Sequence, residues 1–256
     1  MDQHIFSFKT DIVRISIPEK MNNPFAMEIP EIVKVAAKEF QAFISSESKN
    51  WEHDFRVKKG KMFGILVVQK TNGSYAFLGT NSGKLPGNVE CNRFVPSVFD
   101  DSTDDYFINR GMKELSEIGN KIKETNNESK IKELTERRKQ KSFALQQQLF
   151  ENYRFSNING HEQNVLQIFE LSRHGKPPAA AGECAAPKLL QYAFKHQLKP
   201  IALAEFWWGK STKNEEREHK HFYPACRNKC RPILEYILND TDLFKQGNAY
   251  QQKNQN

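Results

Sequence analysis

The sequence predicts an α/β protein that is interrupted by a long helical hairpin. Two strand-like runs flank an Asn-Gly turn within residues 61–84, which is the pattern of a β-hairpin. A third apolar run, 200–208, lies between two segments whose apolar residues recur at helical spacing. Residues 114–152 are rich in Lys, Glu, Gln and Arg and contain no proline, which is typical of long exposed helices.

The first hundred residues supply most of the predicted sheet. Residues 1–20 alternate weakly between apolar and polar side chains and could form one or two strands. Residues 31–45 carry an apolar face at helical spacing, and Pro30 suits the start of that helix. Both arms of the hairpin at 61–84 are almost continuously apolar, so we expect helices to cover both faces of its sheet.

The polar segment in the middle predicts two antiparallel helices or one interrupted helix. Its apolar residues are spaced by three and four, with a polar break at ETNNES. The basic run ERRKQKS could contact RNA or could be a solvated helix face. We expect a core made of residues 1–110 and 156–240, a helical insertion at 111–155 and a disordered tail at 241–256. The insertion could form a homodimer or a protein-interaction scaffold.

Composition narrows the setting without identifying the partner. The chain has 256 residues and a formal net charge of +7, which favours polyanionic partners but also suits a basic protein with no such partner. No run of eighteen apolar residues occurs, so no membrane span is expected. The N-terminus lacks a basic flank followed by a long apolar core, and we therefore expect a cytoplasmic protein.

Three of the four cysteines cluster in the last third of the chain. Cys91 is isolated, whereas Cys184, Cys226 and Cys230 are expected at helix starts, close to prolines that favour a first helical turn. Backbone N–H groups at helix starts stabilise thiolates. Cysteines of a cytoplasmic protein are not expected to form disulfides. Zinc ligation by these three thiols and buried, metal-free thiols are the two interpretations.

The order of the predicted elements resembles the zinc-dependent cytidine deaminase-like fold. That resemblance implies a three-layer core with a mixed sheet, a metal held at two helix starts, and a glutamate two residues after the first ligand that moves protons. This chain has Ala186 at that position and a Cys-x-x-x-Cys pair in place of Cys-x-x-Cys. Glu183 and Glu205 are therefore the candidate catalytic carboxylates.

A second resemblance is carried by PPAAAGECAAPKLLQYAFKHQLKPIALAEFWWG and FYPACRNKCRPIL. These stretches look like the N-terminal accessory region of long RluA-type bacterial pseudouridine synthases, over residues 50–238. The His-Arg-Leu-Asp type motif of the catalytic domain of that family is absent here. The resemblance implies an accessory region of RNA modification that binds RNA or positions the substrate. It would be either a separate protein, with a pseudouridine synthase domain acting in trans, or a truncated form of a longer synthase.

Basic residues around Cys226 and Cys230 form the predicted RNA surface. A charged rim that offsets nearby glutamates is the alternative interpretation. The tryptophan that ends the strand could stack on an unpaired base. The candidate RNA-binding residues are Lys210, Lys213, Arg217, Lys220, Arg227, Lys229, Arg231 and Trp208. Three functions thus stay open: RNA-binding accessory protein, zinc-dependent nucleobase hydrolase and protein-interaction scaffold.

Overall fold

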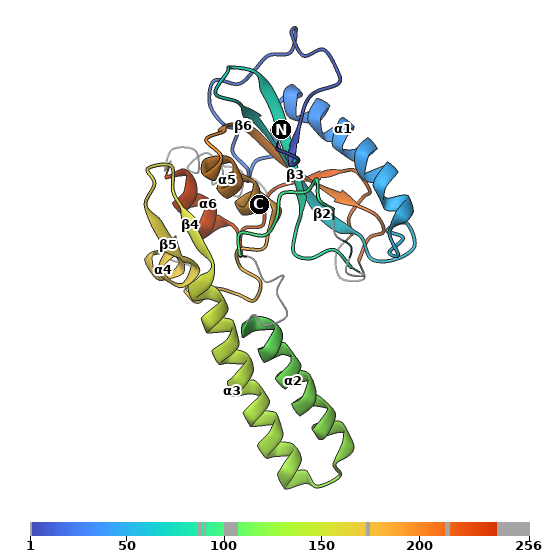
Figure 1. Ribbon diagram of the computed structural model, residues 1–256, viewed down its shortest axis with the longest axis vertical. Coiled ribbons are helices and arrows are strands. Elements are labelled where there is room, and N and C mark those ends of the chain that lie inside the picture. Colours follow the sequence, from blue (N-terminus) through green and yellow to red (C-terminus); the bar gives the residue numbers. More distant parts are fainter. Residues whose placement is uncertain are drawn as a thin grey trace, which may run out of the picture.

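A five-stranded antiparallel sheet organises the protein (Figure 1). The computed structural model describes residues 2–86, 89, 91–99, 107–172, 175–212 and 216–239. The strand order is β1-β3-β2-β6-β7. The strands are β1 (Ile5–Phe6), β2 (Lys61–Gln69), β3 (Tyr75–Asn81), β6 (Lys199–Trp208) and β7 (Phe222–Tyr223).

The hairpin predicted at 61–84 is confirmed as β2 and β3. Gly73 takes the left-handed conformation, with φ +83°, and its N–H donates to the Lys70 carbonyl at 2.9 Å. Glycine adopts this conformation at no steric cost, which is why the Asn-Gly pair is a reliable turn signal. Of the weak N-terminal alternation, the structure forms one short strand, β1, on the outer edge of β3.

The expectation of a mixed sheet is wrong, because every pairing within the five-stranded sheet is antiparallel. Strand β6 lies between β2 and β7 and runs opposite to both. A parallel neighbour for β6 would need another crossover and another strand. Within the described residues, the last element is helix α6 (Arg231–Leu238), so β6 gains no parallel partner there.

Helices cover both faces of the sheet. Helix α1 (Glu31–Glu47) packs on β2 and β6 from one side, and α5 (Ala185–Lys195) packs on β2, β3 and β6 from the other. Side chains of β6 alternate accordingly: Phe206 and Trp208 belong to the cluster under α1, whereas Leu203 belongs to the cluster under α5.

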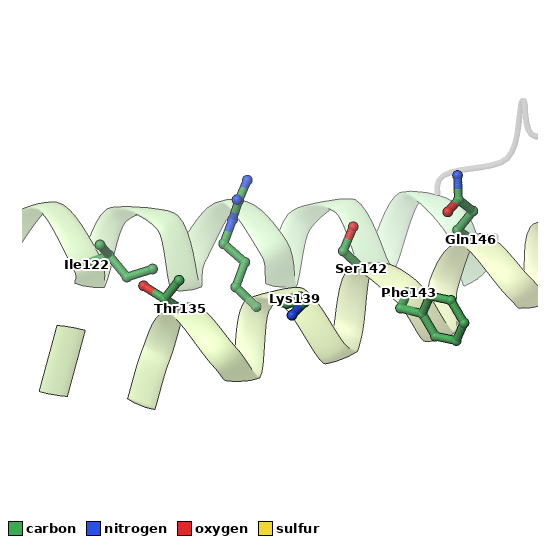
Figure 2. Close-up of a pocket in the computed structure, with 7 residues that line it drawn as sticks. Ile122, Thr135, Lys139, Ser142, Phe143 and Gln146 are labelled. Atoms are coloured by element: carbon green, nitrogen blue, oxygen red, sulfur yellow. The ribbon is translucent and has the colours of Figure 1, made fainter. Parts of the chain in front are cut away.

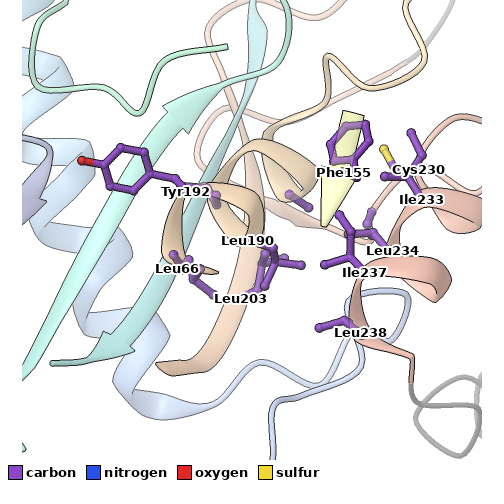
Figure 3. Packing of buried hydrophobic residues seen from close by; sticks show 14 of the residues in the cluster. Leu66, Phe155, Leu190, Tyr192, Leu203, Cys230, Ile233, Leu234, Ile237 and Leu238 are labelled. Atoms are coloured by element: carbon purple, nitrogen blue, oxygen red, sulfur yellow. The ribbon is translucent and has the colours of Figure 1, made fainter. Parts of the chain in front are cut away.

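Behind α5 lies a further group of short elements. These are β4 (Arg154–Ser156), β5 (Glu162–Asn164), α4 (Val165–Leu171) and α6. Figure 3 shows the contact surface, where Ile233, Leu234 and Ile237 of α6 lie near Phe155 and the α5 residues. This packing fixes the start of α6 next to the start of α5, since Cys230 is part of the same buried cluster.

A hairpin of two long helices projects from this core (Figure 1). Helix α2 is Phe107–Glu124 and α3 is Glu128–Asn152, so the helical segment begins four residues earlier and ends three residues earlier than expected for the insertion. Asn127 caps α3 by accepting a hydrogen bond from the Lys130 N–H at 3.1 Å. The 3-10 turn Ser48–Asn50 follows α1. The expected tail, 241–256, lies outside the described residues.

None of the described helices combines the length and apolar character needed to cross a bilayer.

Candidate thiol–carboxylate site

Three cysteine side chains meet at the starts of α5 and α6. Cys184 is the N-cap of α5 and Cys230 is the N-cap of α6. The Cys230 thiol hydrogen-bonds with both Cys184 and Cys226, so the three sulfurs are connected through it. Residues that are more than forty positions apart along the chain are thus brought to one spot by two helix beginnings, which is the arrangement that the cysteine spacing predicts.

Gly64 of β2 makes this approach of α5 feasible. A β-carbon at Gly64 would lie 2.7 Å from the β-carbon of Ala185 and 3.1 Å from Cδ1 of Leu189. Real β-carbon atoms do not approach another atom to 2.7 Å, so only glycine lets the first turn of α5 rest on the strand without a shift. A glycine within an otherwise apolar strand was the available sequence signal for this contact.

In the turn 226–230, several hydrogen-bond donors surround the Cys226 sulfur. The Cys230 thiol and the backbone N–H groups of Lys229, Asn228 and Cys230 lower the pKa of Cys226 to about 5, against some opposition from burial. The Cys226 residue is exposed, whereas Cys230 is buried. Hydrogen bonds with its two neighbours and burial raise the pKa of Cys230, so the buried sulfur keeps its proton and donates it.

The expectation that Cys226 lies at a helix start is wrong. Helix α6 begins at Arg231, and Cys226 lies in the preceding turn, where the Cys230 N–H donates to its carbonyl at 3.1 Å. Pro232 occupies the first turn of α6, where its missing N–H costs no hydrogen bond and its fixed φ suits a helix start. The proline therefore places the helix start after the second cysteine.

Glu205 brings a buried carboxyl group to the thiols. It lies on the α5 side of β6, is 5% exposed, and its Oε1 accepts a hydrogen bond from the Ala186 N–H at 3.1 Å. Burial raises the pKa of Glu205 to about 7, and the charge of Cys226 acts in the same direction, while the Ala186 N–H and Arg217 act against it. The carboxyl therefore exchanges a proton near neutral pH.

Glu205 lies beside Ala186, the residue at which this chain departs from the deaminase-like pattern. The deaminase-like pattern places its glutamate at that residue, in the first turn of the helix. Here the side chain at 186 is a methyl group, and a carboxyl from the neighbouring strand occupies the space beside the same backbone N–H. The strand thus places a carboxyl group beside the first turn of α5, which has none of its own.

Glu183, the other candidate carboxylate, faces a different way. Its carbonyl accepts from the Gly83 N–H at 2.7 Å, and its charge stabilises the half-buried Lys61 ammonium, the pKa of which burial lowers. Glu183 therefore ties the start of α5 to the end of the β2–β3 hairpin, and Glu205 is the carboxyl that faces the thiols.

The donor types at this site suit zinc, which binds thiolates and carboxylates. Within the described ranges, however, no set of three or more His, Cys, Asp or Glu side chains is arranged as a metal-ion site. The thiols contact one another in pairs through Cys230. Zinc binding would replace these contacts by metal–sulfur bonds and would release the thiol protons.

Several of the candidate RNA-binding residues have partners of their own. The Arg217 guanidinium lies 4.7 Å from the Tyr223 ring centre and 5.5 Å from that of Trp207. Arg231 Nε is 2.7 Å from Glu235 Oε1 in an ion pair along α6. Tyr223 lies directly opposite Glu205 in the sheet, and sequence reasoning missed its role as the platform for Arg217.

The expectation that Trp208 offers a free ring face to a base is wrong. The residue is 5% exposed and packs in the cluster under α1, because β6 is covered on both faces. The Lys220 Nζ lies 5.6 Å from the centre of its ring. Lys220 and Lys210 are exposed, and Arg227 and Lys229 are half-buried in the cysteine turn. Lys213 lies outside the described residues.

Lys188 is a further residue that the sequence did not single out. It is 3% exposed, and its Nζ donates to the carbonyls of Asn81 at 3.1 Å and Gly83 at 3.2 Å. This buried ammonium joins α5 to the end of β3 and so fixes the height of the α5 N-terminus over the sheet.

Comparisons of the chain with protein-family models, with curated proteins and with solved structures give no match.

Proposed function

We propose that this chain is an RNA-binding accessory protein of RNA modification. The supporting observation is that basic residues, two exposed and two half-buried, share one end of β6 with the thiol–carboxylate site. Lys210 follows β6 by two positions, and the Lys220 N–H donates to the Trp207 carbonyl at 2.6 Å. Arg227 and Lys229 stand between the two cysteines of the turn. Lysine and arginine side chains in such a group neutralise phosphates and orient a nucleic acid.

The resemblance to the accessory region of pseudouridine synthases supports the same proposal. It spans most of the described core and includes the segments that carry the cysteines. The family's catalytic aspartate motif is absent from these 256 residues, so base isomerisation is assigned to a synthase domain outside them. The role of this chain is then to hold RNA, with the thiol–carboxylate site close to the bound strand.

Charge removal at the basic end of β6 tests this proposal. The double variant Lys220→Gln with Lys229→Gln should weaken binding of a structured RNA, and the slope of log K against log salt should fall by about 0.7–0.9 per lost phosphate contact. Fluorescence anisotropy over a salt series measures both. The matched control is Lys34→Gln with Lys38→Gln, two exposed lysines of α1 that are not among the basic residues at the end of β6. Equal losses in the two double variants would refute a localised RNA surface.

A second candidate function is a zinc-dependent hydrolase that acts on a nucleobase. The observation that favours it is the buried Glu205 carboxyl beside three connected thiols. Cys184, Cys226 and Cys230 would hold the ion, which when bound supplies an activated water. Glu205, with its pKa raised to about 7, can take up and return a proton at Oε1 or Oε2.

Metal analysis of the reduced protein tests the second candidate. The zinc-hydrolase candidate requires one zinc per chain in the wild type and loss of the metal in Cys184→Ser and Cys226→Ser. Cys91→Ser is the matched control, because Cys91 is a half-buried free thiol that lies in the cluster under α1. Metal content that is the same in all four proteins would exclude a thiolate metal site.

A further inference from the structure

The α2–α3 hairpin carries a groove of about 570 Å³, far along the chain from the cysteine region (Figure 2). Helix α3 contributes one stripe of side chains at spacings of three and four, the spacing of one helical face. Ile122 of α2 forms the facing wall. The stripe consists of Thr135, Arg138, Lys139, Ser142, Phe143 and Gln146.

The groove exists because a neighbouring stripe of α3 is used for packing on α2. A β-carbon at Gly111 would lie 2.5 Å from Leu145, so the two helices are in close contact there. Lys141 forms an ion pair with Glu114, and Leu134 is buried. These contacts hold the hairpin together, and they leave the groove side chains beside the interface and not within it.

Arg138 is positioned in the groove by α2. Its Nε donates to the Leu115 carbonyl at 3.3 Å, and it crosses α2 at Gly119, where even a β-carbon would lie 3.7 Å from Nε. A guanidinium has five N–H donors, of which this bond engages one. The remaining donors are those that match phosphate oxygens.

The chemistry of the lining fits a nucleic acid strand. Two side chains are cationic, three are neutral hydrogen-bonding groups, and no carboxylate lines the groove. Phe143 is 58% exposed, which is unusual for a large aromatic residue and suits stacking on an unpaired base. If two copies paired groove to groove, Arg138 and Lys139 would face the same cations, because no carboxylate lines the groove.

We propose that the groove between α2 and α3 binds a single-stranded segment of RNA. Arg138 and Lys139 contact phosphates, Phe143 stacks on one base, and Thr135, Ser142 and Gln146 hydrogen-bond with sugars or base edges. Eleven helical steps separate the ends of the stripe, or about 16 Å, which accommodates about five stacked nucleotides. The inference rests on RNA being the partner, as proposed above, and adds a second contact on the projecting hairpin.

The test uses the full chain and a fluorescent uridine decamer, which has no stable secondary structure. Phe143→Ala should weaken binding about tenfold. Lys139→Gln should reduce the salt slope by about 0.7. Arg137→Gln is the matched control, because it removes the same charge from an exposed position on α3 that lies near Glu114 and not in the groove. Binding by Arg137→Gln should stay within twofold of the wild type.

Three outcomes would overturn the inference, and they differ in whether the proposed RNA-binding function also fails. If the groove variants bind like the wild type while the Lys220 and Lys229 variant does not, the groove is wrong and the proposed function stands. If the wild type binds neither the decamer nor structured RNA, both are wrong. If light scattering shows a dimer that Phe143→Ala dissociates, with RNA binding unchanged, the groove is a protein interface.

Discussion

Glu205 is a buried carboxyl group whose negative charge has few compensating partners. It is enclosed between β6 and the first turn of α5, and its charge is balanced by one backbone N–H together with the more distant Arg217. Because burial disfavours the charged form, its pKa rises from 4.5 to about 7. Ionisation of this single residue therefore couples the stability of the fold to pH.

The direction of this coupling follows from linkage. Since the folded-state pKa lies above the unfolded value, the unfolded chain releases this proton first. Glu205 therefore costs nothing below about pH 4.5 and destabilises the fold increasingly as pH rises through about 7. A difference of that size corresponds to roughly 3 kcal/mol.

The neutral variant Glu205→Gln should remove this pH dependence while keeping an oxygen that accepts from Ala186. We expect wild type and variant to have similar free energies of unfolding near pH 4.5, and the variant to be more stable by roughly 3 kcal/mol above pH 8. Urea unfolding of the metal-free, reduced proteins measures the difference, in which the thiol titrations common to both largely cancel. A difference that is constant between pH 4.5 and 8 would contradict this account.

At the scale of elements, two glycines set how closely helices approach the sheet. Gly64 admits the first turn of α5, and Gly79 of β3 admits α1, since a β-carbon at Gly79 would lie 2.3 Å from the Phe40 ring. Both positions are in the middle of paired strands but serve opposite faces. Substituting each glycine in turn therefore distinguishes an effect on the thiol–carboxylate site from a general effect on core packing.

Gly64→Ala and Gly79→Ala should each lower the free energy of unfolding by about 1–3 kcal/mol, because both overpack the core. Only Gly64→Ala should also displace the start of α5 from Glu205. Amide hydrogen exchange at Ala186, measured against the globally most protected amides, distinguishes the two. Faster exchange at Ala186 in Gly79→Ala, or none in Gly64→Ala, would show that Gly64 does not position the site.

Local patterns predict the elements that depend on local physics. The β2–β3 hairpin follows from Asn72-Gly73, α1 follows from its apolar spacing, and the gathering of the thiols follows from two helix starts around one strand. The start of α6 was misplaced because Pro232, and not the cysteine pair, decides where the helix begins. Trp208 was misjudged because burial on both faces of β6 depends on α1, which is remote in sequence.

For the whole molecule, the sequence indicates which segments form layers but not how the strands are directed. The expected mixed sheet came from a resemblance, and the direction of each strand depends on which later strand pairs with β6. In the part of the chain that the structure describes, β7 takes that place and runs antiparallel. Contacts such as Lys188 with the end of β3 are equally beyond local patterns, since they join residues more than one hundred positions apart.

The pairing of β2 with β6 joins two strands that are separated by the whole helical hairpin. Closing so long a connection has an entropic cost that grows only with the logarithm of its length, so that doubling it adds about 0.6 kcal/mol. The length of the helical hairpin therefore has little effect on the stability of the β2–β6 pairing. A hairpin of different length could stand at the same place, and the reach of the molecule beyond its sheet can vary almost independently of the sheet itself.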